Sequence, residues 1–299
     1  MIGISSRALF NLEEENRIFE EEGLAAYENY QIAHEKDILP KGSAFQLVKA
    51  FLDLNKLHEG GRLVEVIIMS RNSPNTSLRI FNSIRHYGLD ITRAALSGGA
   101  DIAPYLKSFK TSLFLSAHEP DVKQAIDSGI AAGTILPGNL RKEESGQDIF
   151  PIRIAFDGDA VLFSASAERV YRHQGIDAFQ ESEEQMADIP LEKGPFASFL
   201  MTIAHIQSLF QDRESTPIRT ALVTSRNAPA HERAIKTLRE WNVRVDEAFF
   251  LGGVRKTDVL SAFGAHIFFD DQHVHADAAA EVVPSAVVPY RKGDDPAEA

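Results

Sequence analysis

The chain has 299 residues, of which 44% are hydrophobic and 25% charged, a composition typical of a soluble globular protein with a sizeable core. Its net charge of −12 argues against a nucleic-acid partner, because binding phosphate backbones requires a basic surface, but it leaves room for a small anionic ligand. The lack of cysteine excludes disulfides, thiolate nucleophiles and cysteine-ligated zinc. The sequence shows no signal peptide, and no apolar run approaches the roughly 20 residues that cross a bilayer. We therefore expect a cytoplasmic protein with no membrane partner.

The N-terminal half reads as strands that alternate with helices. An apolar, strand-like run over Val64–Met69 leads through Ser70-Arg71-Asn72 into a helical pattern. An insertion over about residues 12–60 separates this strand from the first one. It begins with the acidic run Glu13–Glu22, which we interpret as a solvated helix face with support from Arg17.

Motifs of the first half recur in the second half at an offset of 152 to 155 residues. The matched pairs are Gly23–Tyr27 with Gly175–Phe179, Lys41-Gly42 with Lys193-Gly194, Ser70–Pro74 with Ser225–Pro229, Gly98-Gly99 with Gly252-Gly253, and Leu113–Leu115 with Ile267–Phe269. The repeat predicts two similar α/β domains over residues 1–140 and 149–290, a linker around Pro137–Asp148 and a flexible tail over 291–299. The alternative is that two α/β units resemble each other without a duplication.

Alternating strands and helices predict a parallel sheet with helices on both faces, and ligands of such sheets bind at the carboxyl ends of the strands. In the second half all four polar motifs stand at such ends. They are Asp157-Gly158-Asp159 after the apolar run Ile152–Phe156, Thr224 after the next strand, Lys256 in a Gly-rich loop that opens a helix, and Asp270-Asp271 after the last strand. Their convergence indicates a site.

This set of residues suits hydrolysis of a phosphate monoester. Such a reaction needs an oxygen nucleophile, a proton donor, a divalent cation and fixed donors for the phosphoryl oxygens. Asp157 and Asp159 provide two carboxylates on one short loop. Converging carboxylates repel each other, and Mg²⁺, which prefers oxygen ligands, resolves that conflict.

Each residue also has a simpler interpretation. Thr224 could be a helix N-cap, Lys256 a surface lysine with Arg255 as the phosphate partner, Asp270-Asp271 a helix cap, and Asp157-Gly158-Asp159 a plain turn. The segment Asp270–His275 could also hold a transition metal through His273 and His275, although these histidines suit a helix start equally well.

The sequence resembles the haloacid dehalogenase-like (HAD-like) phosphohydrolases and, more closely, the cytosolic 5′-nucleotidase I family. The segments that carry the resemblance are Ile4–Phe10, His86–Leu89, Phe156–Ser164, Leu222–Thr224, Asp246–Ala248 and His266–Asp271. It implies two tandem HAD-like, Rossmannoid parallel-sheet domains, each with a small cap insertion. The catalytic cap would span about 165–215, with helices at Ala165–Gln174 and Phe196–Phe210, and Phe179 or Phe196 would contact the base or pack in the core.

The resemblance also implies roles for the site residues. Asp157 would attack phosphorus and Asp159 would act as general acid and then base. Thr224, the Ser225 N–H, Arg226 and Lys256 would bind the phosphoryl group, and Mg²⁺ would be held by Asp157, the Asp159 carbonyl and Asp271, with Asp270 as an accessory. The implied substrates are nucleoside 5′-monophosphates and their deoxy forms, with AMP the first to test. The alternatives are a phosphatase for sugar phosphates and a non-catalytic nucleotide sensor.

The repeat makes the first half a degenerate copy. By the offset, Asp157, Asp159, Thr224, Lys256 and Asp270-Asp271 correspond to Ser5, Arg7, Met69, Ile102 and Ser116-Ala117. No aligned carboxylate survives, so this half should neither bind Mg²⁺ nor form an aspartyl-phosphate. Our hypothesis is a candidate effector site for ADP or ATP formed by Ser5, Arg7, Ser70 and Arg71, and the alternative is a packing role or a subunit contact in a homo-oligomer.

Overall fold

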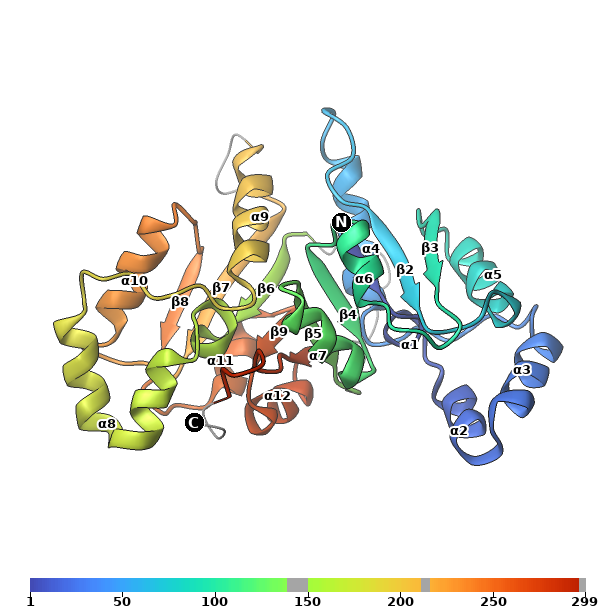
Figure 1. Ribbon diagram of the computed structural model, residues 1–299. Coiled ribbons are helices and arrows are strands. Elements are labelled where there is room, and N and C mark those ends of the chain that lie inside the picture. Colours follow the sequence, from blue (N-terminus) through green and yellow to red (C-terminus); the bar gives the residue numbers. More distant parts are fainter. Residues whose placement is uncertain (139–149, 211–215, 296–299) are drawn as a thin grey trace.

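The computed structural model describes residues 1–138, 150–210 and 216–295. Ten strands form one sheet in the order β3-β2-β1-β4-β5-β10-β9-β6-β7-β8, and helices pack along it (Figure 1). The strands are β1 (Ile2–Ile4), β2 (Val66–Ser70), β3 (Arg93–Leu96), β4 (Leu113–Ser116), β5 (Ala131–Ile135), β6 (Ile152–Phe156), β7 (Ile218–Thr224), β8 (Glu247–Phe250), β9 (Ile267–Asp270) and β10 (Ser285–Val287). The predicted linker and part of the tail lie outside the described residues.

The two halves of the sheet have the same strand order. The first half runs β3-β2-β1-β4-β5 and the second, read from the opposite end, runs β8-β7-β6-β9-β10. Neighbours within each half are parallel, whereas β5 and β10, where the halves meet, are antiparallel. The α/β class and the mostly parallel sheet predicted from the sequence are therefore confirmed. Each half contains five strands, and the fifth, β5 or β10, lies at the seam.

Helices connect the parallel strands, as such crossovers require. The connecting helices are α5 (Leu78–His86), α6 (Ala103–Ser108) and α7 (Glu119–Asp127) in the first half, and α10 (His231–Glu240), α11 (Lys256–Phe263) and α12 (His273–Ala280) in the second. The insertions hold α1 (Ser6–Leu9), α2 (Glu13–Glu22), α3 (Leu24–Ala33), α4 (Phe45–Asp53), α8 (Ser166–Gln185) and α9 (Ala197–Ser208). Short 3₁₀ turns follow at Leu54–Lys56 and Pro74–Thr76, and a one-turn bend spans Gly158–Leu162.

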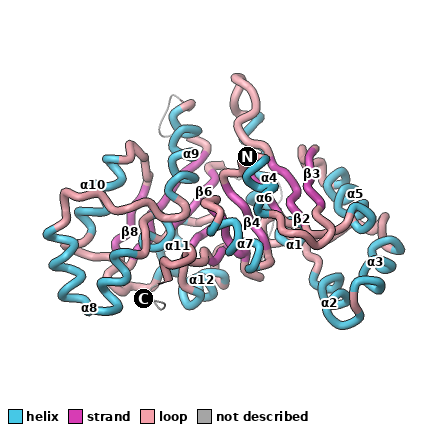
Figure 2. The backbone as a smooth tube through the Cα atoms, in the orientation of Figure 1, coloured by secondary structure: helices cyan, strands magenta, loops and turns pink. Residues whose placement is uncertain are grey.

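Among the helices of the insertions, α2 and α3 lie at one end of the molecule and α8 at the other (Figure 2). Gly23 separates α2 from α3 with φ at +87°, and Gly175 interrupts α8 with φ at +86°. This conformation favours glycine, so both breaks follow from the residue type. α8 extends beyond the predicted end at Gln174, because the chain resumes a helix after Gly175.

The acidic run Glu13–Glu22 forms α2, as predicted, and Arg17 pairs with Glu14 and Glu21 on its exposed side. The interpretation as a wholly solvated face is wrong, however. Glu15 is only 5% exposed and accepts a hydrogen bond from Arg79 at 2.5 Å. A buried carboxylate needs such a partner, so this side of α2 is tied to α5.

Strand pairing gives the residues that correspond between the halves. β6 pairs Phe156 with Leu222 of β7, and β1 pairs Ile4 with Ile68 of β2. Thr224 therefore corresponds to Ser70, and the assignment of Thr224 to Met69 was wrong by one residue. The matching Ser-Arg-Asn letters in the two halves are displaced by one position relative to the backbone.

An aromatic core lies directly beneath the second half's strand ends. Phe156 stacks on Phe269 with ring centroids 5.6 Å apart, and Phe196 of the α9 N-terminus lies 4.5 Å from Phe269. All three rings are buried, so Phe196 has a core role rather than a base-binding one. Because Asp157 and Asp270 are the next residues along β6 and β9, this packing fixes their positions.

Candidate active site

The carboxyl ends of β6 and β9 bring Asp157, Asp270 and Lys256 into direct contact. The Asp157 N–H donates to the Phe269 carbonyl at 2.8 Å, which locks the end of β6 to β9. Lys256, the first residue of α11, places its Nζ 2.9 Å from Asp157 Oδ1 and 2.7 Å from Asp270 Oδ2. All three side chains are buried, so the reading of Lys256 as a surface lysine is wrong.

Three carboxylates gather around this lysine. Oxygen atoms of Asp157, Asp270 and Asp271 all lie within 4.8 Å of one another. Burial raises the pKa of Asp157 to about 7, with a contribution from Asp270, although Lys256 opposes the shift. Burial and the charges of Asp157 and Asp270 also hold the pKa of Asp271 well above its ordinary value. The cluster therefore carries more negative charge than Lys256 neutralises.

A divalent cation fits this cluster. The donors are carboxylate oxygens, which Mg²⁺ prefers, and Asp271 Oδ1 is buried with no hydrogen-bond partner in the described part of the chain. Both oxygens of Asp270, unlike those of Asp271, already have partners, because Oδ2 binds Lys256 and Oδ1 accepts from the Gln272 N–H at 2.9 Å. Asp157 and Asp271 are therefore the better placed ligands.

The second oxygen of Asp271 accepts a hydrogen bond from Tyr290, a residue that the sequence did not indicate as part of the site. The Tyr290 hydroxyl donates to Asp271 Oδ2 and also lies 3.1 Å from Glu168 Oε2. Arg172 in turn binds Glu168 Oε1 at 2.6 Å. Tyr290 follows β10 and Glu168 begins α8, so no local pattern connects either residue to Asp271.

Asp159 is held by Arg226 in a two-pronged ion pair. Arg226 Nε donates to Asp159 Oδ2 at 2.8 Å, and Nη2 donates to Oδ1 at 2.7 Å. Arg226 is only 3% exposed, and its Nη1 binds Glu183 of α8, which also accepts from Arg233 at 2.7 Å. Arg226 was expected to bind a substrate phosphate. In this structure its guanidinium contacts carboxylates instead, and the substrate contact stays a prediction.

Thr224 is the last residue of β7, and its hydroxyl accepts from the Arg226 N–H at 3.3 Å. The N-cap interpretation is wrong, because α10 begins seven residues later at His231. Gly158 packs against Thr224, and a Cβ at residue 158 would lie 3.0 Å from the Thr224 hydroxyl oxygen. Only glycine leaves that hydroxyl undisturbed. Ser225 is exposed beside it.

The transition-metal alternative receives little support. His273 and His275 open α12, in agreement with the helix-start interpretation. His273 faces Asp277, and His275 Nδ1 lies 3.6 Å from Asp270 Oδ1. Within residues 1–138, 150–210 and 216–295, the metal-ligating cluster consists of aspartates and includes neither histidine.

The chain is similar to known 5′-nucleotidases over nearly its whole length. Residues 1–295 match a family model described as 5′-nucleotidase. The chain is 38% identical over 300 residues to human cytosolic 5′-nucleotidase 1B, an alignment that covers 97% of this chain and 49% of the relative. The chain thus spans about half the length of the curated relative that it matches. No solved structure matches the chain. Among the described residues, none of the helices combines the length and apolarity that a membrane span requires.

Proposed function

The chain belongs to the 5′-nucleotidase family, and on that premise we propose that it hydrolyses nucleoside 5′-monophosphates to nucleoside and phosphate. One observation carries the proposal. The carboxylates of Asp157, Asp270 and Asp271 and the ammonium group of Lys256 meet at the carboxyl ends of two adjacent parallel strands. Ligands of such sheets bind at those ends.

The first step is attack by an Asp157 oxygen on phosphorus. The bond from phosphorus to the ribose O5′ breaks, Asp159 gives its proton to O5′, and an aspartyl-phosphate remains. Lys256 supports the attack because its Nζ, 2.9 Å from Asp157, opposes the rise in pKa that burial causes and so favours the ionised nucleophile. The Thr224 hydroxyl and the Ser225 N–H lie at the end of the neighbouring strand and would donate to the phosphoryl oxygens.

The second step returns the enzyme to its starting state. Asp159 takes a proton from water, whose oxygen attacks phosphorus and releases inorganic phosphate from Asp157. Two nitrogens of the Arg226 guanidinium donate to Asp159 and orient its carboxyl oxygens as acceptors, so the contact suits the base role. The acid role requires Asp159 to leave Arg226, and we infer that this exchange accompanies substrate binding.

The residues that would hold Mg²⁺ are Asp157, Asp271 and the Asp159 carbonyl, with Asp270 as an accessory. The free buried oxygen of Asp271 supports this assignment. When bound, the ion would neutralise the charge of the carboxylates and of the phosphoryl group. The chain's own contribution is to hold Asp157 and Asp271 at fixed strand ends.

The finer fold assignment belongs to the same proposal. We infer two tandem HAD-like domains from an internal duplication, with a degenerate first copy, a division near residues 140–149 and a catalytic cap over about 165–215. Identical strand order in the two halves and the paired bridges Phe10 to Lys41 and Phe163 to Lys193 support it. α8, which carries Glu183 to Arg226, would then connect the cap to the catalytic acid.

Phosphate release from the common ribo- and deoxyribonucleoside monophosphates tests the proposal, with AMP first and with Mg²⁺ or excess EDTA. We expect turnover with Mg²⁺, loss in EDTA and a fall of at least ~10³-fold for Asp157→Asn, because the amide cannot attack phosphorus. Asp258→Asn is the matched control, since Asp258 is exposed on α11 and should leave kcat unchanged.

Two results would contradict the proposal in different ways. Faster turnover of sugar phosphates than of any nucleotide would keep the chemistry and overturn the substrate class. Full activity in EDTA, or in Asp157→Asn, would overturn the mechanism itself.

A further inference from the structure

We propose that Tyr290 is a positioning residue for Asp271, and that it determines which oxygen of this carboxylate is open to the divalent cation. This role rests on the function proposed above, because Asp271 is one of the proposed Mg²⁺ ligands. The Tyr290 hydroxyl donates to Asp271 Oδ2, whereas Asp271 Oδ1 is buried with no hydrogen-bond partner in the described part of the chain. The protein therefore holds one oxygen and leaves the other free.

The Tyr290 hydroxyl is the middle of a chain of hydrogen bonds. A tyrosine hydroxyl has one proton to donate and can also accept. Its contact with Asp271 is shorter than the 3.1 Å to Glu168 Oε2, so the proton is directed at Asp271. Arg172 Nη2 lies 3.4 Å from the hydroxyl oxygen and 2.6 Å from Glu168 Oε1. Hydrogen bonds in series polarise one another, so Arg172 strengthens the bond from Tyr290 to Asp271.

The segment that carries Tyr290 is tethered on both sides. Before it, the Val288 N–H donates to the Asp270 carbonyl at 2.9 Å. After it, the Lys292 N–H donates at 2.8 Å to Asp127 Oδ1, on the last residue of α7 in the first half. A hydroxyl on a segment held in this way has a defined position. That is what the orientation of a metal ligand requires.

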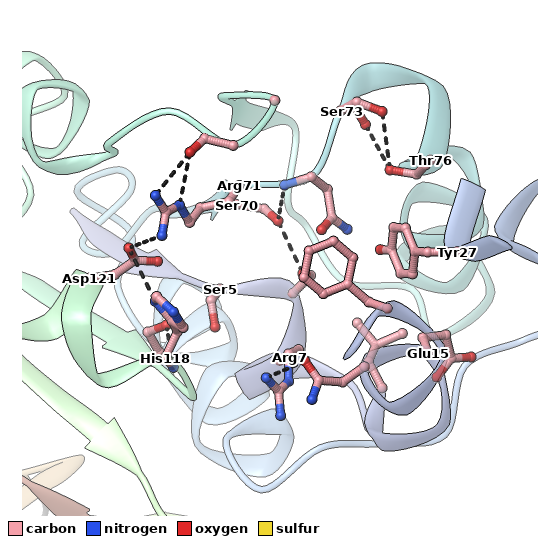
Figure 3. A pocket seen from close by; sticks show the side chains of 18 of the residues that line it. Ser5, Arg7, Glu15, Tyr27, Ser70, Arg71, Ser73, Thr76, His118 and Asp121 are labelled. Carbon is pink, nitrogen blue, oxygen red and sulfur yellow. Dashed lines mark hydrogen bonds and ion pairs between the residues drawn. The ribbon is translucent and has the colours of Figure 1, made fainter. Parts of the chain in front are cut away.

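The first half provides an internal comparison, since strand pairing places Ala117 at the position of Asp271. A cavity opens at its strand ends, and the residues of the candidate effector site line it: Ser5, Arg7, Ser70 and Arg71 (Figure 3). Counted from the pairs of β4 with β5 and of β9 with β10, Pro137 corresponds to Tyr290. The half without the carboxylate thus also lacks the hydroxyl. This agrees with a role of Tyr290 toward Asp271 rather than toward the sheet.

Removal of the hydroxyl would leave Asp271 Oδ2 without its donor. The carboxylate could then turn about its Cβ–Cγ bond, and the cation would have to impose the order that Tyr290 now provides. Groups that hold a metal ligand in place typically account for about 10- to 100-fold in metal affinity. The cost should therefore fall on Mg²⁺ binding and not on contacts with the nucleotide.

Isothermal titration of the metal-free full chain with Mg²⁺ alone tests this role. Tyr290→Phe keeps the ring and removes only the hydroxyl, and it should lower the Mg²⁺ affinity by about tenfold or more. With AMP as substrate, the Mg²⁺ concentration for half-maximal activity should rise by the same factor. At saturating Mg²⁺, kcat and the KM for AMP should equal the wild-type values. Tyr105→Phe, at an exposed tyrosine on α6, is the matched control and should change none of these quantities.

Arg172→Gln tests the same chain of hydrogen bonds from its exposed end, with less risk to folding. The Arg172 side chain is 38% exposed, and its loss should weaken Mg²⁺ binding by about two- to fivefold. Thermal unfolding in EDTA shows whether each variant is folded. If Tyr290→Phe does not fold, the titration of Arg172→Gln decides.

The outcomes separate this role from the proposed function. Wild-type Mg²⁺ affinity in the folded variants would refute the role of Tyr290 and leave the function standing. A raised KM for AMP at saturating Mg²⁺, with unchanged Mg²⁺ affinity, would also refute it, because Tyr290 would then act on the substrate. If the wild type binds Mg²⁺ but releases no phosphate from any monophosphate, the function is wrong, and the titrations still decide the role of Tyr290.

Discussion

At the scale of single residues, the candidate active site is a buried excess of negative charge. Lys256 touches two of its three carboxylates, and burial alone would lower the pKa of Lys256, yet Asp157 and Asp270 together raise it. The lysine is therefore a fixed cation. One lysine does not offset the repulsion among three carboxylates, and burial together with this repulsion raises the pKa values of Asp157 and Asp271. A phosphate-transfer site with a divalent cation would relieve it.

This repulsion predicts a pH-dependent stability in the absence of metal. Asp157 has a pKa of about 7 in the folded protein against 3.8 as the ordinary value, so the folded state holds its proton more tightly. The contribution is present below pH 4 and is lost as the pH rises to 7 and above. Asp271 acts in the same direction. We expect urea unfolding in EDTA to show a lower free energy of unfolding at pH 7.5 than at pH 5.

The shift of Asp157 alone corresponds to about 4 kcal/mol, of which about 2.5 kcal/mol falls between pH 5 and 7.5, and Asp271 adds to it. Asp270 does not cancel this loss of stability between pH 5 and pH 7.5. Burial would raise its pKa, but the nearby His275 ring and the Lys256 ammonium group hold that pKa below the ordinary value of 3.8. Asp157→Asn should flatten the pH dependence, and Mg²⁺ should restore stability at pH 7.5. A metal-free wild type that gains stability between pH 5 and 7.5 would show that another group dominates.

At the scale of elements, α8 carries a contact that reaches Asp159, the proposed catalytic acid. Glu183 on α8 bridges Arg226 and Arg233, and Arg226 holds Asp159. Glu183 is only 2% exposed, and a carboxylate buried to this degree needs the two arginines as partners. This makes Glu183 a positioning residue for Asp159 through Arg226.

Glu183→Gln should therefore affect stability and turnover together. Removing one partner of a buried ion pair costs about 3–5 kcal/mol, and a misplaced Asp159 should lower kcat about 10- to 100-fold with a smaller change in KM. Thermal unfolding and phosphate release measure the two effects. Glu184→Gln, at the exposed neighbour on the same helix, should change neither. Equal effects of the two substitutions would rule out the positioning role.

Elements were predictable from the sequence where a local pattern specifies them. The apolar runs before Asp157 and Asp270 indicated both strands, and parallel strands meet at one edge, so the meeting of these residues followed. Glu183 and Tyr290 gave no such signal. Their contacts with Arg226 and Asp271 join positions 43 and 19 residues apart, through a helix packing and a chain segment after β10. Periodicity and motif spacing carry no information on such pairs.

The repeat shows a second limit of sequence matching. The identical letters Ser70-Arg71-Asn72 and Ser225-Arg226-Asn227 suggest that Ser70 corresponds to Ser225. Strand pairing shows instead that Ser70 corresponds to Thr224. The feature that the two halves share is a hydroxyl side chain on the last residue of the strand, Ser70 in β2 and Thr224 in β7. This correction matters chemically, because it puts a serine hydroxyl, rather than the apolar Met69, at the first-half position that corresponds to Thr224.

At the scale of the whole molecule, the two halves share one sheet through the antiparallel seam of β5 and β10. Ile135 pairs with Ala286 and Thr134 with Val287. Gly133 of β5 lies under the second half, since a Cβ there would be 3.0 Å from Ala286 Cβ and 3.2 Å from the Phe269 ring. Phe269 precedes Asp270, so packing at the seam reaches the active site.

Gly133→Val should therefore destabilise both halves at once. Added methyl groups in a tightly packed seam cost about 1–3 kcal/mol. Trp241, the single tryptophan, reports on the second half, and far-UV circular dichroism reports on both. We expect the urea midpoints of the two signals to coincide and to shift together. Because one sheet passes through both halves, a substitution in the first should lower the midpoint seen by a tryptophan in the second.

Thr134→Val, one residue further along β5, is the control for this experiment. It keeps the side-chain shape and removes a hydroxyl that is buried without a hydrogen-bond partner in the described structure, so stability should stay equal or rise. If Gly133→Val shifts the circular dichroism but leaves the Trp241 transition in place, the halves unfold separately. Mechanical coupling of the two halves through the seam would then be excluded.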